Sequence, residues 1–314
     1  MLRFLTIRIS LMLVTLIVIS MAIFSITEVL PGDITHMMLR GTWTEEGAAR
    51  IRERLELDRP PYQRYASWVG GVVQGDLGES YISNEPIADI LPRRIKHSLI
   101  LAVFALLVGI PFAVIAGIWA GIRPDGIGDR LVSTISLVGI SLPEFVTGVI
   151  LMLVLASTLD LLPPSSIMLP GESPFTRPEI LVLPTLTLTG VLFAYVMRMT
   201  RASVMEVMQS HYVRTAVLKG MPLRRVIVRH VLPNSMLPTI TIIAQNFGWM
   251  LGGLIIVENV FAYPGLGQLM LTGMVTRDVP LLEAVALIIA GTYAVSNMVA
   301  DLSYGVLDPR IRLS

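Results

Sequence analysis

Residues 211–235, HYVRTAVLKGMPLRRVIVRHVLPNS, form a basic segment between two long apolar stretches. The basic or titratable side chains of this segment are His211, Arg214, Lys219, Arg224, Arg225, Arg229 and His230. No acidic residue stands among them. Basic residues in a short loop favour the cytoplasmic side of a membrane protein. A loop that only sets orientation needs positive charge, whereas this one also carries helix-stop residues and apolar positions at helical spacing.

The composition is that of a membrane protein. Of the 314 residues, 54% are hydrophobic and 15% are charged, and the mean hydropathy is +0.71. Soluble domains carry roughly 25% charged residues. The net charge of +1 gives no support for nucleic-acid binding, and the lack of cysteine excludes disulfides and thiolate metal sites.

Apolar stretches long enough to cross a bilayer, which takes about 20 residues, occur six times. The predicted spans are 9–30, 98–120, 131–157, 180–199, 236–257 and 281–300. The sequence therefore predicts an all-α, polytopic integral membrane protein with six transmembrane helices. The first stretch is too long for the apolar core of a signal peptide, so we expect an uncleaved anchor.

The basic residues also predict the orientation of the chain. They gather at the N-terminus, in the loop 120–130, in the segment 211–235 and in the C-terminal tail, with Arg310 and Arg312. The loops 158–179 and 258–280 hold one Arg each. If six helices alternate, every basic loop falls on the same side, so we expect both termini to be cytoplasmic.

The sequence predicts that the chain is divided into two parts. Residues 1–97 would form the anchor helix and a long periplasmic loop, and residues 98–314 a five-helix core with a cytoplasmic loop at about 202–235. In the long loop, residues 45–58 predict a short exposed helix and residues 62–73 an amphipathic segment. That segment belongs either to a solvated cap or to the membrane surface, and the loop is also a candidate docking surface for an extracytoplasmic partner.

Proline lies inside predicted spans at Pro111, Pro143 and Pro184, and kinks there would suit helices around a path that opens and closes. The only acid well inside a span is Glu144. A carboxylate in the membrane is costly and normally faces a cavity or a partner. Glu144, with Pro143, is therefore a candidate lining residue of a translocation path. The alternative is a structural role, with the carboxyl protonated or bonded to backbone that Pro143 leaves free.

Small residues within the spans and an arginine near a span end permit two further inferences. The pairs Gly117/Gly121 and Gly248/Gly252 have the spacing that favours close helix contacts. Arg201 lies at the end of a predicted span, where a side chain extended toward the membrane surface would account for it.

The sequence contains no motif of a catalytic or cofactor site. A G-x4-G-K-[ST] phosphate loop, H-E-x-x-H and G-x-S-x-G are all missing. We therefore expect no catalytic residue, no cofactor and no metal in this chain. The histidines His36, His97, His211 and His230 lie in loops or at span ends, which argues against a bare-metal site within the membrane.

Within the basic segment the sequence predicts a helix, a turn and a second helix. Residues 202–218 form the first helix, and Gly220 ends it. Pro222 begins the second helix, and Pro233 closes it. In the first helix the residues that share an apolar face are Tyr212, Val213, Ala216 and Val217. Paired helices with apolar faces are typical of a projection that fits the groove of a partner.

The spacing of this segment resembles the loop signature of importer permeases of the ATP-binding-cassette (ABC) class, E-A-A-x3-G-x9-I-x-L-P. The matching residues are Arg214, Thr215, Ala216, Gly220, His230, Leu232 and Pro233. Arg214 departs from the Glu of the general signature, but R-T-A-x3-G is typical of the dipeptide/oligopeptide/nickel permease family. Residues 57–80, 257–269 and 307–312 also resemble that family, so the resemblance covers nearly the whole chain.

The resemblance implies a type I ABC importer permease fold and the B-type permease subunit of a bacterial inner-membrane importer, most similar to those for dipeptides and oligopeptides. A second permease would complete the translocation path, and two ATPase subunits would bind ATP and Mg²⁺. A periplasmic or lipid-anchored binding protein would deliver the substrate. The loop near 209–220, including Tyr212, would be the coupling helix in an ATPase groove.

Two other classes of function remain open at this point. One is an ion-coupled secondary transporter that works alone and uses Glu144 as its proton carrier. The single buried acid and the absence of an evident inverted repeat provide little for such coupling. The other is a scaffold or channel for other membrane proteins.

Overall fold

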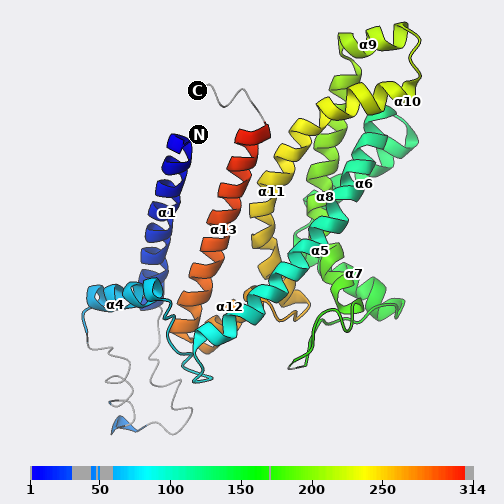
Figure 1. Ribbon diagram of the computed structural model, residues 1–314. Helices are drawn as coiled ribbons and strands as arrows, with labels where there is room; N and C mark the ends of the chain where they lie inside the picture. Colours follow the sequence, from blue (N-terminus) through cyan, green and yellow to red (C-terminus); the bar gives the residue numbers. More distant parts are fainter. Residues whose placement is uncertain (1, 30–43, 47–48, 50–58, 170, 308–314) are drawn as a thin grey trace. The chain divides into compact units, whose positions relative to one another are not determined.

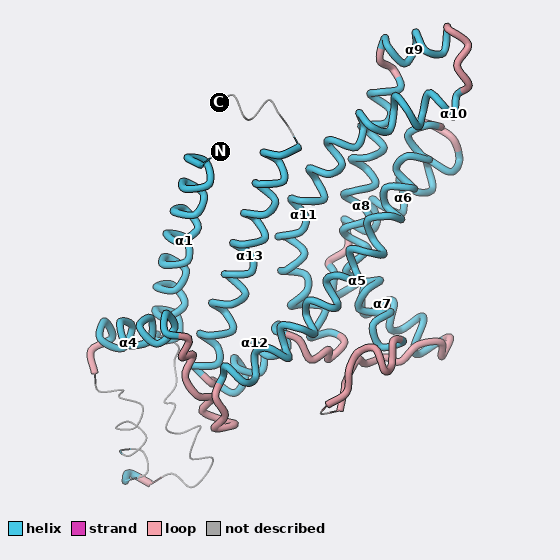
Figure 2. The backbone as a smooth tube through the Cα atoms, viewed as in Figure 1, coloured by secondary structure: helices cyan, strands magenta, loops and turns pink. Residues whose placement is uncertain are grey.

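The computed structural model describes residues 2–29, 44–46, 49, 59–169 and 171–307. Over these residues Figure 2 shows helices and loops and no strand, so the predicted all-α fold is confirmed. The helices are α1 (Leu2–Val29), α4 (Pro61–Gln74), α5 (Ile87–Ile122), α6 (Ile127–Ser141), α7 (Glu144–Leu151), α8 (Glu179–Met208), α9 (His211–Leu218), α10 (Leu223–Val226), α11 (Leu232–Val260), α12 (Leu266–Thr276) and α13 (Val279–Leu307), with π-helical segments η1 (Met152–Thr158) and η2 (Ile227–Val231). Most of the predicted helix at 45–58 and the tail after Leu307 lie outside the described residues.

Five helical stretches in the described part of the chain are long and apolar enough to cross a membrane. They are Thr6–Glu28, Ile87–Ile122, Glu179–Met208, Leu223–Asn246 and Val279–Val299. A sixth span exists if the pair Ile127–Ser141 and Glu144–Thr158, bent by 113°, is counted as one. The multi-span fold therefore agrees with the prediction.

The predicted span at 131–157 is not one straight helix, because it breaks at Pro143. Leu142 adopts extended backbone angles, φ −94° and ψ 132°, as residues before proline usually do. Pro143 then precedes the first residue of α7. In contrast, α5 and α8 continue through Pro111 and Pro184 without a break.

The chain forms two compact units, each described here by itself. Unit 1 comprises Met1–Ser98 and Pro264–Val295. Its core joins the first turns of α5 to α12 and to the start of α13. The buried core residues are Ile87, Leu91, Leu266, Leu269, Leu281, Ala284 and Val285. The guanidinium of Arg94 adds a hydrogen bond to Gln268 Oε1 at 3.0 Å.

A buried carboxylate, Asp278, anchors the loop before α5 to the start of α13. Asp278 is 0% exposed and accepts hydrogen bonds from Ser80 Oγ at 2.5 Å and from the backbone N–H of Tyr81 at 3.1 Å. These donors offset the cost of burying the charge, and the start of a helix favours an anion. Burial, with Glu283 and Asp278 nearby, raises the pKa of the Tyr81 hydroxyl to about 12, so the phenol remains neutral in this loop.

Unit 2 comprises Leu99–Tyr263 and Ser296–Ser314, and its central helix is α8. The helices α6, α7 and α11 all pack against α8. Threonines lie among the buried residues of α8, and Thr200 accepts a hydrogen bond from Thr239 of α11 at 3.2 Å. In Figure 1, α9 and α10 lie at the end of α8 opposite α7. The long central helix therefore separates α9 and α10 from α7.

Close contact between α5 and α8 depends on two glycines. A Cβ on Gly117 would lie 2.6 Å from the Cβ of Thr200, and one on Gly121 would lie 2.8 Å from the Cβ of Val204. Both distances are shorter than side-chain contacts allow, so the helices could not approach this closely with larger residues. The inferred role of this glycine pair is confirmed. A Cβ on Gly252 would meet no described atom within 4 Å.

We expect Gly117→Ala to destabilise the protein by about 1–3 kcal/mol, because the added methyl group overpacks the contact with α8. Thermal unfolding of the purified transporter would measure the change. The matched control is Gly190→Ala within α8, where a Cβ meets nothing within 4 Å. Equal melting temperatures for the two variants would contradict the close contact.

Candidate functional site: the helical hairpin between α8 and α11

The candidate site is a helical hairpin, residues 209–231, which contains α9, α10 and η2. The predicted single helix over 202–218 is wrong, because α8 ends at Met208 and α9 begins at His211. Ser210 between them is extended, with φ −67° and ψ 149°. Its hydroxyl donates a hydrogen bond to the Val207 carbonyl oxygen at 2.6 Å. Serine favours such local backbone bonds over a continuous helix, and this starts α9 in a new direction.

Gly220 ends α9 in a left-handed conformation, with φ +78°. The N–H of Gly220 donates to the carbonyl of Val217 at 2.9 Å, and the N–H of Met221 donates to that of Ala216 at 3.3 Å. This pair of bonds is the Schellman motif, which satisfies the last carbonyls of a helix. A Cβ on Gly220 would meet nothing within 4 Å, so positive φ and not crowding is what requires glycine here.

A small buried core holds the hairpin to the ends of α5 and α8. The buried residues of this hairpin core are Val204 of α8, Val213 and Ala216 of α9, Val226 of α10 and Val231 of η2. Ile118 and Ile122 of α5 pack against it from one side. The hairpin is therefore a packed element whose direction is set by the neighbouring helices.

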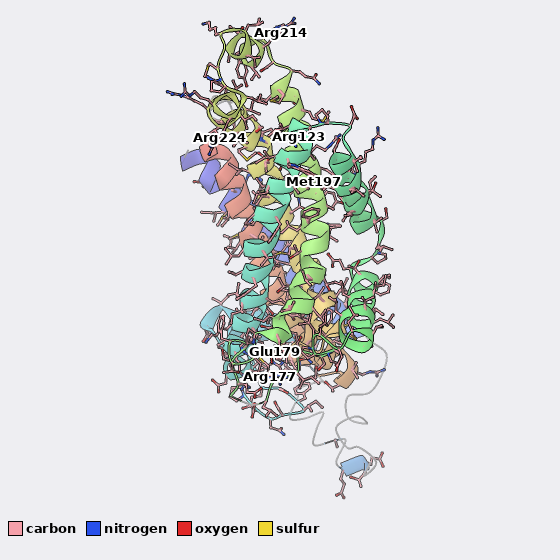
Figure 3. The ribbon with its side chains drawn as sticks, turned by 90° about the vertical axis from the view of Figure 1, so that its right-hand side faces the viewer. Arg123, Arg177, Glu179, Met197, Arg214 and Arg224 are labelled. Atoms are coloured by element: carbon pink, nitrogen blue, oxygen red, sulfur yellow. The ribbon has the colours of Figure 1, made fainter. Side chains whose placement is uncertain are left out.

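The opposite side of the hairpin is exposed and both apolar and basic. Tyr212 is 45% exposed and Leu218 is 79% exposed. The apolar face predicted for α9 is thus divided, with Val213 and Ala216 inside and Tyr212 outside. Arg214 lies at the tip (Figure 3) and forms no ion pair within the described part of the chain. An exposed surface of this composition is suited to a protein partner.

The second half of the hairpin runs directly into α11. Pro222 stands just before α10, and η2 leads to Leu232, the first residue of α11. The prediction that Pro233 closes the helix is wrong. Pro233 lies in the first turn of α11, where a missing N–H is tolerated, and the π-helical turn before it takes up the change in hydrogen bonding. His230 and Leu232 are half-buried.

An ion pair fixes the start of α6 to α8 close to the hairpin. The guanidinium of Arg201 donates to both carboxylate oxygens of Asp129, at 2.5 and 2.7 Å. The side chain of Asp129 is 3% exposed and also accepts a hydrogen bond from the backbone N–H of Asp125 at 2.9 Å. Arg201 is therefore held by Asp129 and does not simply extend toward the membrane surface, as the sequence had suggested. The partners are 72 residues apart, so no local pattern could have revealed the pair.

Glu144 begins α7 immediately after the break at Pro143. Its carboxylate lies against Gly253 of α11, where any Cβ would overlap the carboxylate oxygens. Among the described residues no hydrogen-bond donor or cation pairs with it. Glu144 is half-buried and Pro143 is exposed. The described residues also contain no group of three or more His, Cys, Asp or Glu that could hold a metal ion.

Comparison with known proteins assigns the family. The model of the binding-protein-dependent transport system inner membrane component matches residues 109–313. The N-terminal model of a binding-protein-dependent transport system membrane component matches residues 1–102. The chain belongs to this family.

Two relatives of this permease are themselves named as permease proteins of transport systems. It is 33% identical over 290 residues to the probable peptide ABC transporter permease protein y4tP of Sinorhizobium fredii, with 92% of this chain and 93% of the relative covered. It is 34% identical over 298 residues to the glutathione transport system permease protein GsiC of Escherichia coli, with 95% of each chain covered. The protein is a permease subunit of a binding-protein-dependent ABC importer of the inner membrane, and its resemblance to the dipeptide/oligopeptide/nickel family is confirmed.

The permease presents its predicted site residues in two places. The coupling-loop residues are Tyr212, Arg214, Thr215, Ala216 and Gly220 in and after α9, and Leu232 and Pro233 at the start of α11. Pro143 and Glu144 lie where α6 ends and α7 begins, with the Glu144 carboxylate beside Gly253 of α11. Their roles remain predictions.

We expect Gly220→Val to impair transport while the protein still inserts into the membrane. A β-branched residue at positive φ is strained by roughly 1–2 kcal/mol or more, which distorts the turn that directs α9. The matched control is Gly220→Asn, because asparagine tolerates this conformation. Uptake by reconstituted vesicles measures the effect, and equal uptake in both variants would contradict it.

Proposed function

We propose that this permease uses the hairpin to receive motion from an ATP-binding subunit and so imports a peptide-type substrate. The observation that carries the proposal is that α9 has two different sides. Val213 and Ala216 fix it to α5 and α8, whereas Tyr212 and Leu218 remain exposed. A rigid helix with an exposed apolar side can transmit the movement of a partner whose groove it occupies.

Charge distribution in unit 2 supports a cytoplasmic position for the hairpin, and the basic residues of the sequence near both termini support the same side for the termini. Figure 3 shows Arg123, Arg214 and Arg224 at one end of unit 2, with Arg177 and Glu179 at the other. Arg177 is paired with Glu179 at 3.4 Å, so that end has little free positive charge. The basic end of a membrane protein faces the cytoplasm.

The further partners follow from membership of an importer family. A second permease subunit would complete the translocation path, and two ATP-binding subunits would bind ATP and Mg²⁺ and carry out hydrolysis. A periplasmic or lipid-anchored binding protein would present the substrate. The names of the relatives, which refer to peptide and glutathione, support a dipeptide or oligopeptide as the substrate.

Glu144 is proposed to line the path. The carboxylate lies at the break of a bent span and has no partner among the described residues. Burying an unpaired acid within a membrane span costs free energy, and such an acid normally faces a polar path.

We expect Arg214→Glu to lower binding-protein-stimulated ATP hydrolysis about tenfold, the effect of losing roughly 1.4 kcal/mol at the contact. The matched control is Arg123→Glu, which makes the same charge change at the same end of unit 2 but outside the hairpin. An Asp or Glu of the ATPase groove changed to Arg should restore hydrolysis in the Arg214→Glu variant. Equal loss in both variants, or no rescue by any groove acid, would contradict a specific contact.

We expect Glu144→Gln to reduce ATP-driven uptake several-fold and to leave assembly of the transporter intact, because it removes the charge and keeps the shape. Uptake is measured in vesicles that contain the permeases, ATPase subunits and binding protein. The chain alone, under a proton gradient, should take up nothing. Gradient-driven uptake by the chain alone would favour an ion-coupled secondary transporter, and an unchanged rate in Glu144→Gln would return Glu144 to a structural role.

A further inference from the structure

The helix α4 in unit 1 is amphipathic, and only part of its apolar side is covered. At helical spacing the apolar side consists of Pro61, Tyr62, Tyr65, Ala66, Trp68, Val69, Val72 and Val73. The opposite side consists of Gln63, Arg64, Ser67, Gly70, Gly71 and Gln74. The helix begins at a proline and ends at Gly75 with φ +84°, so it is a defined element and not a frayed extension.

One half of the apolar side packs on α1. The ring of Phe24 meets Tyr65 edge-on, with centroids 5.4 Å apart, and lies 6.3 Å from the ring of Trp68. Ser20 Oγ and the Tyr65 hydroxyl form a hydrogen bond of 2.8 Å. These contacts hold α4 crosswise at the C-terminal end of α1, as Figure 1 shows.

Two further bonds fix this arrangement. Arg64 of α4 forms an ion pair with Glu28, so the only charged side chain of α4 is neutralised within the chain. Thr27 of α1 donates a hydrogen bond to Glu283 of α13 at 2.6 Å. The end of α1 that carries α4 is therefore fixed within unit 1.

The other half of the apolar side is bare. Tyr62 is 70% exposed and Val73 is 81% exposed, and Ala66 between them is exposed as well. The helix α1 also exposes apolar side chains, among them Val18, 58% exposed, and Ile26, 63% exposed. Only 6% of the apolar stretch of α1 is buried within the chain, as expected of a span surrounded by lipid.

We propose that α4 lies in the lipid headgroup region of the leaflet at the C-terminal end of α1, with its bare apolar side in contact with acyl chains. In the orientation proposed above this is the outer leaflet. The polar side, with Gln63 and Ser67, faces water. Tyrosine and tryptophan favour this depth of the bilayer, and a helix parallel to the membrane with one apolar side binds there. The helix then holds the start of the loop 75–86 at the membrane surface.

The test uses the absence of cysteine from the sequence, so that a single introduced cysteine is the only label site on this chain. Val73→Cys and Ala66→Cys report on the apolar side, and Gln63→Cys and Ser67→Cys report on the polar side. Each is assembled with cysteine-free partner subunits, labelled with a nitroxide and reconstituted in vesicles of phosphatidylethanolamine and phosphatidylglycerol. Electron paramagnetic resonance then measures collisions with oxygen, which partitions into lipid, and with a water-soluble nickel chelate. Val18→Cys on α1 is the lipid-facing reference.

Labels at Val73 and Ala66 should collide more with oxygen than with the nickel chelate, as at Val18, and labels at Gln63 and Ser67 should show the reverse. Preferential collision of all four with the nickel chelate would place α4 in water and overturn the proposal. Immobile labels at Val73 and Ala66, shielded from both reagents, would show that a protein partner covers this side and would overturn it equally.

Discussion

The close contact of α5 with α8 is the constraint on which unit 2 depends. In lipid, burial of apolar surface does not drive helices to associate. The association of α5 with α8 therefore depends on van der Waals packing at small residues. Gly117 and Gly121 let the two backbones approach, and Thr200 and Val204 fill the space that the glycines leave. The ion pair of Asp129 with Arg201 then fixes α6 to the same helix. The hairpin is attached to the ends of these packed helices, so its direction follows from the contact between them.

Within the hairpin, packing and charge have separate tasks. Val213, Ala216 and Val226 face inward and set the position of α9, and the Schellman turn at Gly220 fixes where it ends. The arginines face outward and take no part in the hairpin core. The charge of this short segment can therefore set the orientation of the protein in the membrane, while its packing presents a surface of fixed shape to a partner.

Much of this architecture follows from the sequence, because the length of an apolar run decides whether a helix can span a bilayer. The hairpin was also foreseen, since Gly220 and the apolar positions indicate two helices and a turn. The positions at which the helices break were not predicted from the sequence. The helix breaks at Pro143, whereas α5 and α8 continue through Pro111 and Pro184, because the consequence of a proline depends on which neighbours satisfy the freed backbone. The helix break at Ser210 and the π-helical turn before Pro233 likewise depend on which local groups satisfy the backbone hydrogen bonds. Long-range pairing of Asp129 with Arg201 requires knowledge of how the helices are arranged.

The difference in burial between α1 and α8 has a consequence for biosynthesis. Within the chain 6% of the apolar stretch of α1 is buried, against 61% of that of α8. Most of the first helix has no neighbour within the chain, apart from the contacts with α4 and α13 toward its C-terminal end, so it can leave the translocation machinery and reside in lipid as soon as it is made. The later helix carries Thr200 and Arg201, whose partners Thr239 and Asp129 lie on other helices of the finished fold. Its release into lipid should therefore await the helices on either side of it, so that the permease completes its membrane insertion as a group of helices after an independent first step.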